Sequence, residues 1–259
     1  MVKLIVFDLD GTFLNSEHHY DTKVLSLIEA LKEQKYLFGI ATGRPFFAVT
    51  SLFDNIFKYF DFVVTNNGSE YFTEDNYHSI SKLTMNQVMD VVEIAGEYKS
   101  NIISVNEDKF VIDFPTNYTG QLSTIGSVIV GDHDYTGTYN HPKIMIHDDE
   151  AILDKIQNSL SHSEQSFDFV KSQHDLLEFV PKGVDKMSTI KTYIKDNINE
   201  EIHITTFGDN HNDFNLINEA DIGIAMNNAV PEIKKIADLT ISSNDEDSII
   251  HYLSSLLTE

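Results

Sequence analysis

The stretch VKLIVFDLDGTFLN, residues 2–15 of a chain of 259, decides the predicted fold. Residues 4–7 form an unbroken apolar run, which is typical of a strand buried on both faces of a parallel sheet. Asp8 and Asp10 follow at once, and their side chains point the same way because strand side chains alternate with period two. Like charges this close raise each other's pKa unless a cation lies between them. An Asp-Gly turn alone is ordinary, but this combination predicts an all-oxygen site of the kind that Mg²⁺ prefers.

Alternating helices and strands are predicted on both sides of a middle segment. The helices are expected at residues 21–35, 45–59, 210–220, 230–237 and 245–257, with a further helix that begins at Asp185 and buries Met187, Ile190 and Ile194. The further strands are expected at 37–41, 62–65, 201–207, 222–225 and 238–241. Such alternation implies right-handed crossovers and a parallel, Rossmann-like sheet. Ligands of these sheets bind beyond the carboxyl ends of the strands, where Asp8, Thr42 and Asn67 are expected.

The middle segment breaks this rhythm. A polar hairpin is predicted at 70–82, an amphipathic helix at 85–98, and then short strands with a helix near 151–160; residues 117–139 show no clear periodicity. A unit of about 100 residues is an ordinary domain size. We therefore predict an α/β fold with a discontinuous core, residues 1–82 and 183–259, and an inserted α+β cap domain, residues 83–182.

Composition narrows the possible functions. The formal net charge is −23, from 18 Lys+Arg against 41 Asp+Glu, so no nucleic-acid or membrane partner is expected. The absence of cysteine excludes disulfides and thiolate chemistry. No apolar run reaches the ~20 residues of a transmembrane helix. The charged pair beginning at Asp8 comes too early for a signal peptide, so a cytoplasmic protein is expected, as a monomer or weak homodimer.

Three further clusters follow predicted strand or helix ends. Thr42, before Gly43 and Arg44, could hold phosphate oxygens together with backbone N–H groups. Lys186 lies in the first turn of its helix, where a cation opposes the macrodipole, and such a broken local rule hints at function. Lys182 is its competitor, but we expect Lys182 to face solvent. The third cluster is GDNHND, residues 208–213, in which Asp209 can add a metal ligand and Asn212 and Asp213 return to the same side of a helical turn.

Together these motifs resemble the haloacid dehalogenase superfamily, whose first motif is a strand that ends in Asp-x-Asp-Gly-Thr, as in residues 8–12. The other motifs follow in that family's order, and the resemblance covers the whole chain. The insert position, ATGRP at 41–45, the Asn-Gly pair at 67–68 and IGIAM at 222–226 resemble the Cof-type sugar phosphatases. Met187 departs from the small residue that often follows the lysine there, which we expect to alter packing more than chemistry.

The resemblance implies Mg²⁺-dependent hydrolysis of phosphomonoesters of small metabolites, with sugar phosphates as the first expectation. It implies that Asp8 attacks phosphorus to form an aspartyl-phosphate and that Asp10 acts as general acid and base. Mg²⁺ would be held by Asp8, the backbone carbonyl of Asp10, and Asp209. The phosphate would be held by Thr42, Lys186 and Asn212. Asp213 would orient Lys186 or a metal-bound water, and Gly43 and Arg44 would contact the substrate.

The insert is expected to close over the pocket and to select the leaving group. Its aromatic candidates, which are more often core residues, are Tyr118, Tyr135, Tyr139, Phe110 and Phe114. His133, His141 and His147 lack a ligand spacing for a second metal and are expected in solvated loops. Two alternatives to the hydrolase stay open: a sugar phosphomutase of the same superfamily, and a non-enzymatic phosphoacceptor or binding protein.

Overall fold

The computed structural model describes all residues except 107, 132, 134–140, 163 and 258–259. The chain forms two compact units. The core unit comprises Met1–Gly43, Asn55–His78 and Asp185–Glu259, and the inserted unit comprises Arg44–Asp54 and Ser79–Val184. No helix among the described residues is long and apolar enough to span a membrane.

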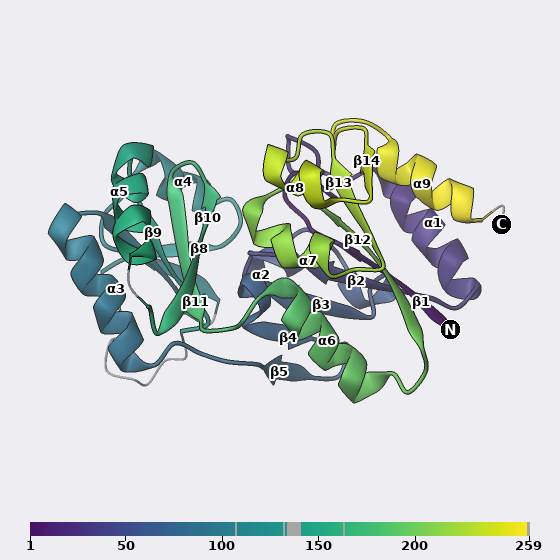
Figure 1. The fold of residues 1–259 in the computed structure, drawn as a ribbon, viewed down its shortest axis with the longest axis horizontal. Helices are drawn as coiled ribbons and strands as arrows, with labels where there is room; N and C mark the ends of the chain where they lie inside the picture. The colour runs from purple at the N-terminus through teal and green to yellow at the C-terminus, as the bar shows by residue number, and fades with distance from the viewer. Residues whose placement is uncertain (107, 132, 134–140, 163, 258–259) are drawn as a thin grey trace. The chain divides into compact units, whose positions relative to one another are not determined.

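The core unit is built on one sheet (Figure 1). Over the described residues its order is β14 (Leu239–Ile241), β13 (Ile222–Met226), β12 (Ile202–Gly208), β1 (Val2–Phe7), β2 (Tyr36–Ala41), β3 (Phe62–Thr65), β4 (Glu70–Phe72) and β5 (Tyr77–Ser79). The strands from β14 to β3 are parallel, and β4 runs antiparallel to β3. The predicted parallel sheet is therefore confirmed.

The register of the central strands aligns their carboxyl ends. Phe7 of β1 pairs with Ile40 of β2 on one side and with Phe207 of β12 on the other. The residues that follow these three strands therefore leave the sheet at one edge, where Asp8 comes directly after Phe7. β1 is buried from Leu4 to Phe7, as expected for the centre of a parallel sheet.

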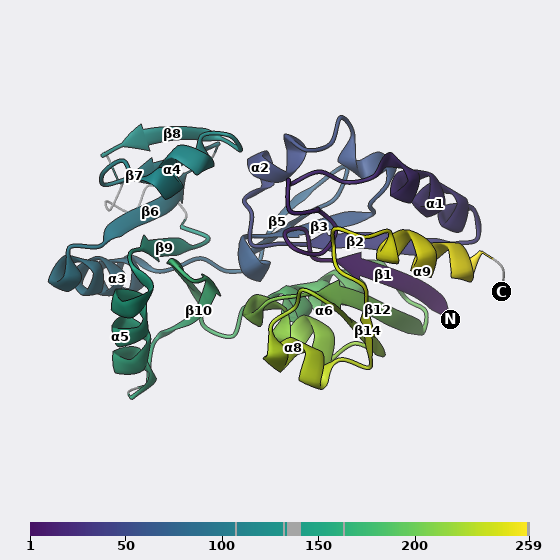
Figure 2. The ribbon, with the colours of Figure 1, turned by 90° about the horizontal axis from the view of Figure 1, so that it is seen from above.

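Helices cover this sheet (Figures 1 and 2). They are α1 (Thr22–Glu33), α6 (Lys186–Asn197), α7 (Phe214–Asn218), α8 (Pro231–Ile236) and α9 (Ser248–Leu256), with single 3₁₀ turns η1 (Ile56–Lys58), η2 (Asn66–Gly68) and η3 (His211–Asp213). In both views α1 and α9 lie side by side, and α7 contacts both α6 and α8.

Three predicted helices are interrupted or begin later in the structure, and near each of these points a side chain bonds the backbone. The helix predicted at 45–59 is α2 (Phe46–Thr50) and, after a break, the turn η1; the hydroxyls of Thr50 and Ser51 at the end of α2 bond back to carbonyls three residues earlier, which weakens a helix. The helix predicted at 210–220 is η3 followed by α7, because the Asp213 carboxylate accepts two preceding N–H groups. The last helix begins at Ser248, since Asp245 instead accepts hydrogen bonds from Ser16.

The inserted unit is an α+β unit with a mainly antiparallel sheet. Over its described residues the order is β10 (Phe167–Gln173), β11 (Leu176–Pro181), β9 (Ile144–His147), β6 (Asn101–Asn106), β7 (Lys109–Ile112) and β8 (Ser127–Val130). Apolar residues of α3 (Met85–Tyr98) and α5 (Glu150–Ser161) pack on one face with Ile102 of β6. Ile103 points the other way, into a second cluster with α4 (Asn117–Leu122) and with Phe47 of α2. The α/β fold class with an inserted α+β unit is confirmed.

Candidate active site

Three aspartates gather at the carboxyl edge of the core sheet. Asp8 follows β1, Asp209 follows β12, and Asp213 ends η3. Each offers one carboxylate oxygen that lies within 4.8 Å of the others. Among the described residues this is the one group of three metal-ligating side chains. The structure therefore brings together two of the predicted metal ligands, Asp8 and Asp209, and adds Asp213 to them.

Lys186 supplies the positive charge of this cluster. Its Nζ donates to Oδ1 of Asp8 and to Oδ1 of Asp213, at 2.6 Å each. Its side chain has no exposed surface, whereas that of the competitor Lys182 is 55% exposed and lies 3.2 Å from Asp168. Lys186 is the first residue of α6, and Asp185 caps that helix by accepting the N–H of Ser188 at 2.8 Å. The cap places a negative charge where the helix start disfavours the lysine.

Burial and neighbouring charges shift the pKa values of Asp8, Asp209 and Lys186. Burial raises the pKa of Asp8 well above its usual range; Lys186 opposes this, while Asp213 and Asp209 add to it. Burial also raises the pKa of Asp209 to about 7, with Asp213 as the second cause. Burial acts to lower the pKa of Lys186, but the charges of Asp213 and Asp8 outweigh it and hold the amine protonated. One lysine among three carboxylates leaves excess negative charge that favours a cation.

Asp213 links Lys186 to the loop that follows β12. Its Oδ1 accepts from Lys186, and its Oδ2 accepts the N–H groups of Asp209 and Asn210 at 2.9 and 3.0 Å. Both oxygens are therefore engaged by donors. This arrangement favours the predicted role of orienting Lys186 over that of a direct metal ligand.

Thr12 and Gly11 shape the other side of Asp209. The Thr12 hydroxyl, almost fully buried, donates to Oδ1 of Asp209 at 2.9 Å. Gly11 has φ +80°, and a Cβ there would lie 2.4 Å from Oδ2 of Asp209. Glycine is therefore needed both for the turn and for the approach of the carboxylate. Thr12 was not among the predicted site residues, although the Gly-Thr pair is part of the Asp-x-Asp-Gly-Thr motif.

Asp10 lies apart from the buried cluster. Its side chain is 42% exposed, and Oδ1 lies 3.2 Å from Nδ1 of His18. It is within the same tight loop as Asp8, since the N–H of Phe13 donates to the Asp8 carbonyl at 3.2 Å. An exposed carboxyl group beside a buried one is suited to exchange protons with a substrate and water.

Thr42, Asn67 and Asn212 are linked across neighbouring strand ends. The N–H of Asn67 donates to the Thr42 carbonyl at 3.1 Å, and Nδ2 of Asn212 donates to Oδ1 of Asn67 at 3.0 Å. Thr42 and Asn67 are buried, and Asn67 has φ +55°. Asn67 was expected at this edge but was not assigned a role. The Asn-Asn-Gly sequence, which favours left-handed backbone, was the available signal.

The remaining predicted substrate residues are Gly43 and Arg44. Gly43 ends the first segment of the core unit, and Arg44 is a buried residue of the inserted unit. In the inserted unit, Phe110 is buried in the core, as expected for most aromatic residues, and Phe114 is exposed. Tyr135 and Tyr139 lie outside the described residues.

The expectation of solvated histidines in the insert is wrong. The side chain of His133 is only 5% exposed, with Nδ1 2.9 Å from the Ser104 hydroxyl and Nε2 3.1 Å from Asp113. His141 is also buried. The third predicted loop histidine, His147, stacks on Tyr118 with ring centroids 4.7 Å apart. His147 ends β9, whereas His133 and His141 lie outside the strands with little exposed side-chain surface.

The fold and this edge define an α/β enzyme with a carboxylate-rich site beside a buried lysine. The chain belongs to the haloacid dehalogenase-like hydrolases, because the model of that family matches residues 5–253. A similar protein is YitU of Bacillus subtilis, a 5-amino-6-(5-phospho-D-ribitylamino)uracil phosphatase, which is 26% identical over 96% of each chain. YbhA of Escherichia coli, a pyridoxal phosphate phosphatase, is 24% identical over 98% of each chain.

Among solved structures, that of the HAD subclass IIB sugar phosphatase BT4131 has the same fold. It covers 98% of each chain with a TM-score of 0.83 at 20% identity. The family and these relatives make the chain an enzyme of the phosphatase type.

Proposed function

We propose that the protein is a Mg²⁺-dependent phosphomonoester hydrolase of small phosphorylated metabolites, acting through an aspartyl-phosphate on Asp8. The observation that carries the proposal is the buried Lys186, bonded to Asp8 and Asp213 beside Asp209. Sugar phosphates are the first substrate class to test. The relatives named above act on a ribitylaminouracil phosphate and on pyridoxal phosphate, so the test must include esters beyond sugars.

The donor set fits Mg²⁺. It offers only oxygen, burial raises the pKa of Asp8 and Asp209, and a divalent cation removes the repulsion that causes part of both shifts. We assign the metal ligands as Asp8, Asp209 and the backbone carbonyl of Asp10. When bound, Mg²⁺ supplies charge neutralisation for the phosphoryl oxygens.

Asp8 acts as the nucleophile. Its carboxylate oxygen attacks phosphorus in line, the P–O bond to the leaving group breaks, and an acyl phosphate forms on Asp8. Lys186 stays protonated because of its two carboxylate partners, so it offsets negative charge on the transferring group. Thr42 and Asn212 hold phosphate oxygens, with Asn67 fixing the side chain of Asn212.

Asp10 moves the protons. Its carboxyl group donates a proton to the oxygen of the leaving alcohol, and the resulting carboxylate then takes a proton from the water that attacks the aspartyl-phosphate. Inorganic phosphate leaves, and Asp8 and Asp10 return to their initial states. The exposure of Asp10 supports this exchange.

The insert is assigned a separate role. We propose that residues 83–182 are the cap domain and select the leaving group, and that residues 1–82 and 183–259 are the catalytic core. The family resemblance supports this division, because the insert falls between the second and third motifs.

The test is release of inorganic phosphate from a panel of phosphorylated metabolites, with Mg²⁺ and with excess EDTA. Wild type is compared with Asp8→Asn and with Asp90→Asn, which makes the same change on the exposed surface of α3. We expect Mg²⁺-dependent release by wild type and Asp90→Asn and none by Asp8→Asn. No release from any ester by wild type would contradict the hydrolase and direct the work to a mutase assay.

A further inference from the structure

His18 lies in a turn that follows the loop of Asp8 and Asp10, and its side chain points back to Asp10. Nδ1 of His18 lies 3.2 Å from Oδ1 of Asp10, which is within hydrogen-bond distance. The two side chains are 66% and 42% exposed, so neither is forced into this position by burial. Holding two exposed side chains in one geometry costs conformational entropy, and a fixed backbone around the pair reduces that cost.

The backbone at His18 is both strained and braced. Its φ is +60°, in the left-handed region that residues with a Cβ seldom adopt. The N–H of His18 donates to the Asn15 carbonyl at 2.9 Å, and the N–H of Asn15 donates to the His19 carbonyl at 2.8 Å. Oδ1 of Asn15 also accepts the N–H groups of Glu17 and His19. Strain of this kind persists only where the surroundings over-determine the conformation.

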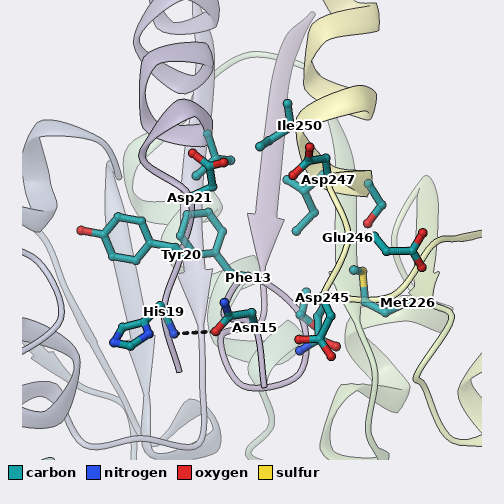
Figure 3. Close-up of a pocket in the computed structure, with 15 residues that line it drawn as sticks. Phe13, Asn15, His19, Tyr20, Asp21, Met226, Asp245, Glu246, Asp247 and Ile250 are labelled. Carbon is teal, nitrogen blue, oxygen red and sulfur yellow. Dashed lines mark hydrogen bonds between the residues drawn. The ribbon is translucent and has the colours of Figure 1, made fainter. Parts of the chain in front are cut away.

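The C-terminal part of the core unit adds a second set of braces. Asp245 accepts both the N–H and the hydroxyl of Ser16 at 2.8 Å, and Asn244 donates to the Leu14 carbonyl at 2.9 Å. Figure 3 shows Asn15 and Asp245 in the wall of the same cavity, which has a volume of about 210 Å³. Two distant segments therefore hold the turn that aims His18.

We propose that His18 is a positioning residue for Asp10 in the reaction assigned above, and this inference rests on that proposed function. The imidazole N–H at Nδ1 donates to Oδ1 of Asp10 and fixes the rotation of the carboxyl group. The transferable proton then resides on Oδ2, from which it passes to the oxygen of the leaving group as the P–O bond breaks. The proton returns to Oδ2 from water in the second step, and His18 itself neither gains nor loses one.

The neighbouring histidine provides the matched control. The side chain of His19 is 77% exposed, and its Nδ1 lies 3.9 Å from Glu17, beyond hydrogen-bond distance. It has no contact with Asp10 among the interactions of the described residues, although it belongs to the same turn. A variant of His19 therefore changes the turn without changing the proposed contact.

The test uses the dependence of rate on the leaving group. kcat/KM, which includes phosphoryl transfer to Asp8, is measured for 4-nitrophenyl phosphate and for the best alkyl ester in the panel. The alkoxide needs the proton and 4-nitrophenolate hardly does, so a loss of Asp10 positioning acts selectively on the alkyl ester. We expect His18→Ala to lower kcat/KM for the alkyl ester by about 10-fold or more and for 4-nitrophenyl phosphate by less than about 3-fold. His18→Asn, whose amide can also donate, should recover part of the loss, and His19→Ala should match wild type.

Each outcome decides the inference separately from the proposed function. An inactive wild type refutes the hydrolase itself. If wild type is active and His18→Ala lowers kcat/KM equally for both substrates, or for neither, the positioning role is refuted. The Asp10→Asn/His18→Ala double variant completes the cycle: with Asp10 gone, removing His18 should cause no further selective loss.

Discussion

Replacing Lys186 by methionine directly tests the buried ion pairs of Lys186 with Asp8 and Asp213, because it removes the charge and keeps an unbranched side chain. The change leaves Asp8 and Asp213, both buried, without the cation that lies 2.6 Å from each. Removing one partner of a buried ion pair typically destabilises a protein by about 3–5 kcal/mol. We expect Lys186→Met to lower the free energy of unfolding by about this amount in EDTA and to abolish phosphate release.

Helix α6 also provides a matched control. Lys191 pairs with Glu219 at 2.5 Å, but these side chains are 52% and 40% exposed. Exposed pairs contribute about 0–1 kcal/mol, so Lys191→Met should change stability only within that range. Urea unfolding followed by circular dichroism measures both variants, and an unchanged slope with a lower midpoint identifies a true loss of stability.

Equal losses of stability in Lys186→Met and Lys191→Met, measured in EDTA, would refute the larger contribution of the buried ion pairs of Lys186. A second measurement covers the case in which Lys186→Met does not fold. In the Lys186→Met/Asp213→Asn double variant one unpaired charge is removed with the lysine, so stability should recover relative to Lys186→Met alone. A further loss in the double variant would show that Asp213 is needed for reasons other than its pair with Lys186.

Two further predictions concern the metal site. The raised pKa of Asp209, about 7 against an ordinary 3.8, means that its contribution to the stability of the metal-free protein is full below pH 3.8 and is lost as pH rises to about 7; Asp8 shifts the same way. The gain in melting temperature on adding Mg²⁺ should therefore be larger at pH 8 than at pH 5. In Asp209→Asn the gain should depend less on pH. An equal gain for wild type at pH 5 and pH 8 would contradict the raised pKa of Asp209. Gly11→Ala combines a positive φ with a Cβ 2.4 Å from Asp209, whereas a Cβ at Gly183, where φ is +73°, would meet no atom of the described residues within 4 Å apart from its chain neighbours. Both alanine variants should lose about 1–2 kcal/mol from the backbone, but calorimetry should show loss of Mg²⁺ binding only in Gly11→Ala; equal Mg²⁺ affinity in the two variants would refute the close approach.

Much of the site was predictable because parallel strands bring their carboxyl ends to one edge. Asp8 and Asp209 are about 200 positions apart, yet each directly follows a strand with a buried carboxyl end, β1 and β12, and the register places Phe7 opposite Phe207. The choice of Lys186 over Lys182 also followed from local rules, since only Lys186 lies in the first turn of the helix. Periodicity and end positions carry this information within short windows of sequence.

What could not be predicted depends on partners far away in the sequence. Asp245 looked like a helix start, but its carboxylate binds Ser16, and no local pattern signals a bond across more than two hundred residues. His133 was expected to be solvated because its contacts with Ser104 and Asp113 exist only after the insert folds. Propensity is a weak guide wherever a tertiary hydrogen bond competes with it.

The acidic edge explains why a lysine occupies an unfavourable place at the start of α6. Asp8 and Asp209, which follow β1 and β12, are carboxylates, and the cation beside them comes from α6, which begins near the same edge. At that position the helix dipole opposes a lysine, and Asp185 compensates by capping the helix through Ser188. Asp185 also accepts from Asn215 of α7 at 2.8 Å, which ties the start of α6 to the helix that follows Asp213. Lys186 opposes the dipole of α6, and Asp185, which caps that helix, also binds the helix that follows Asp213, the partner of Lys186.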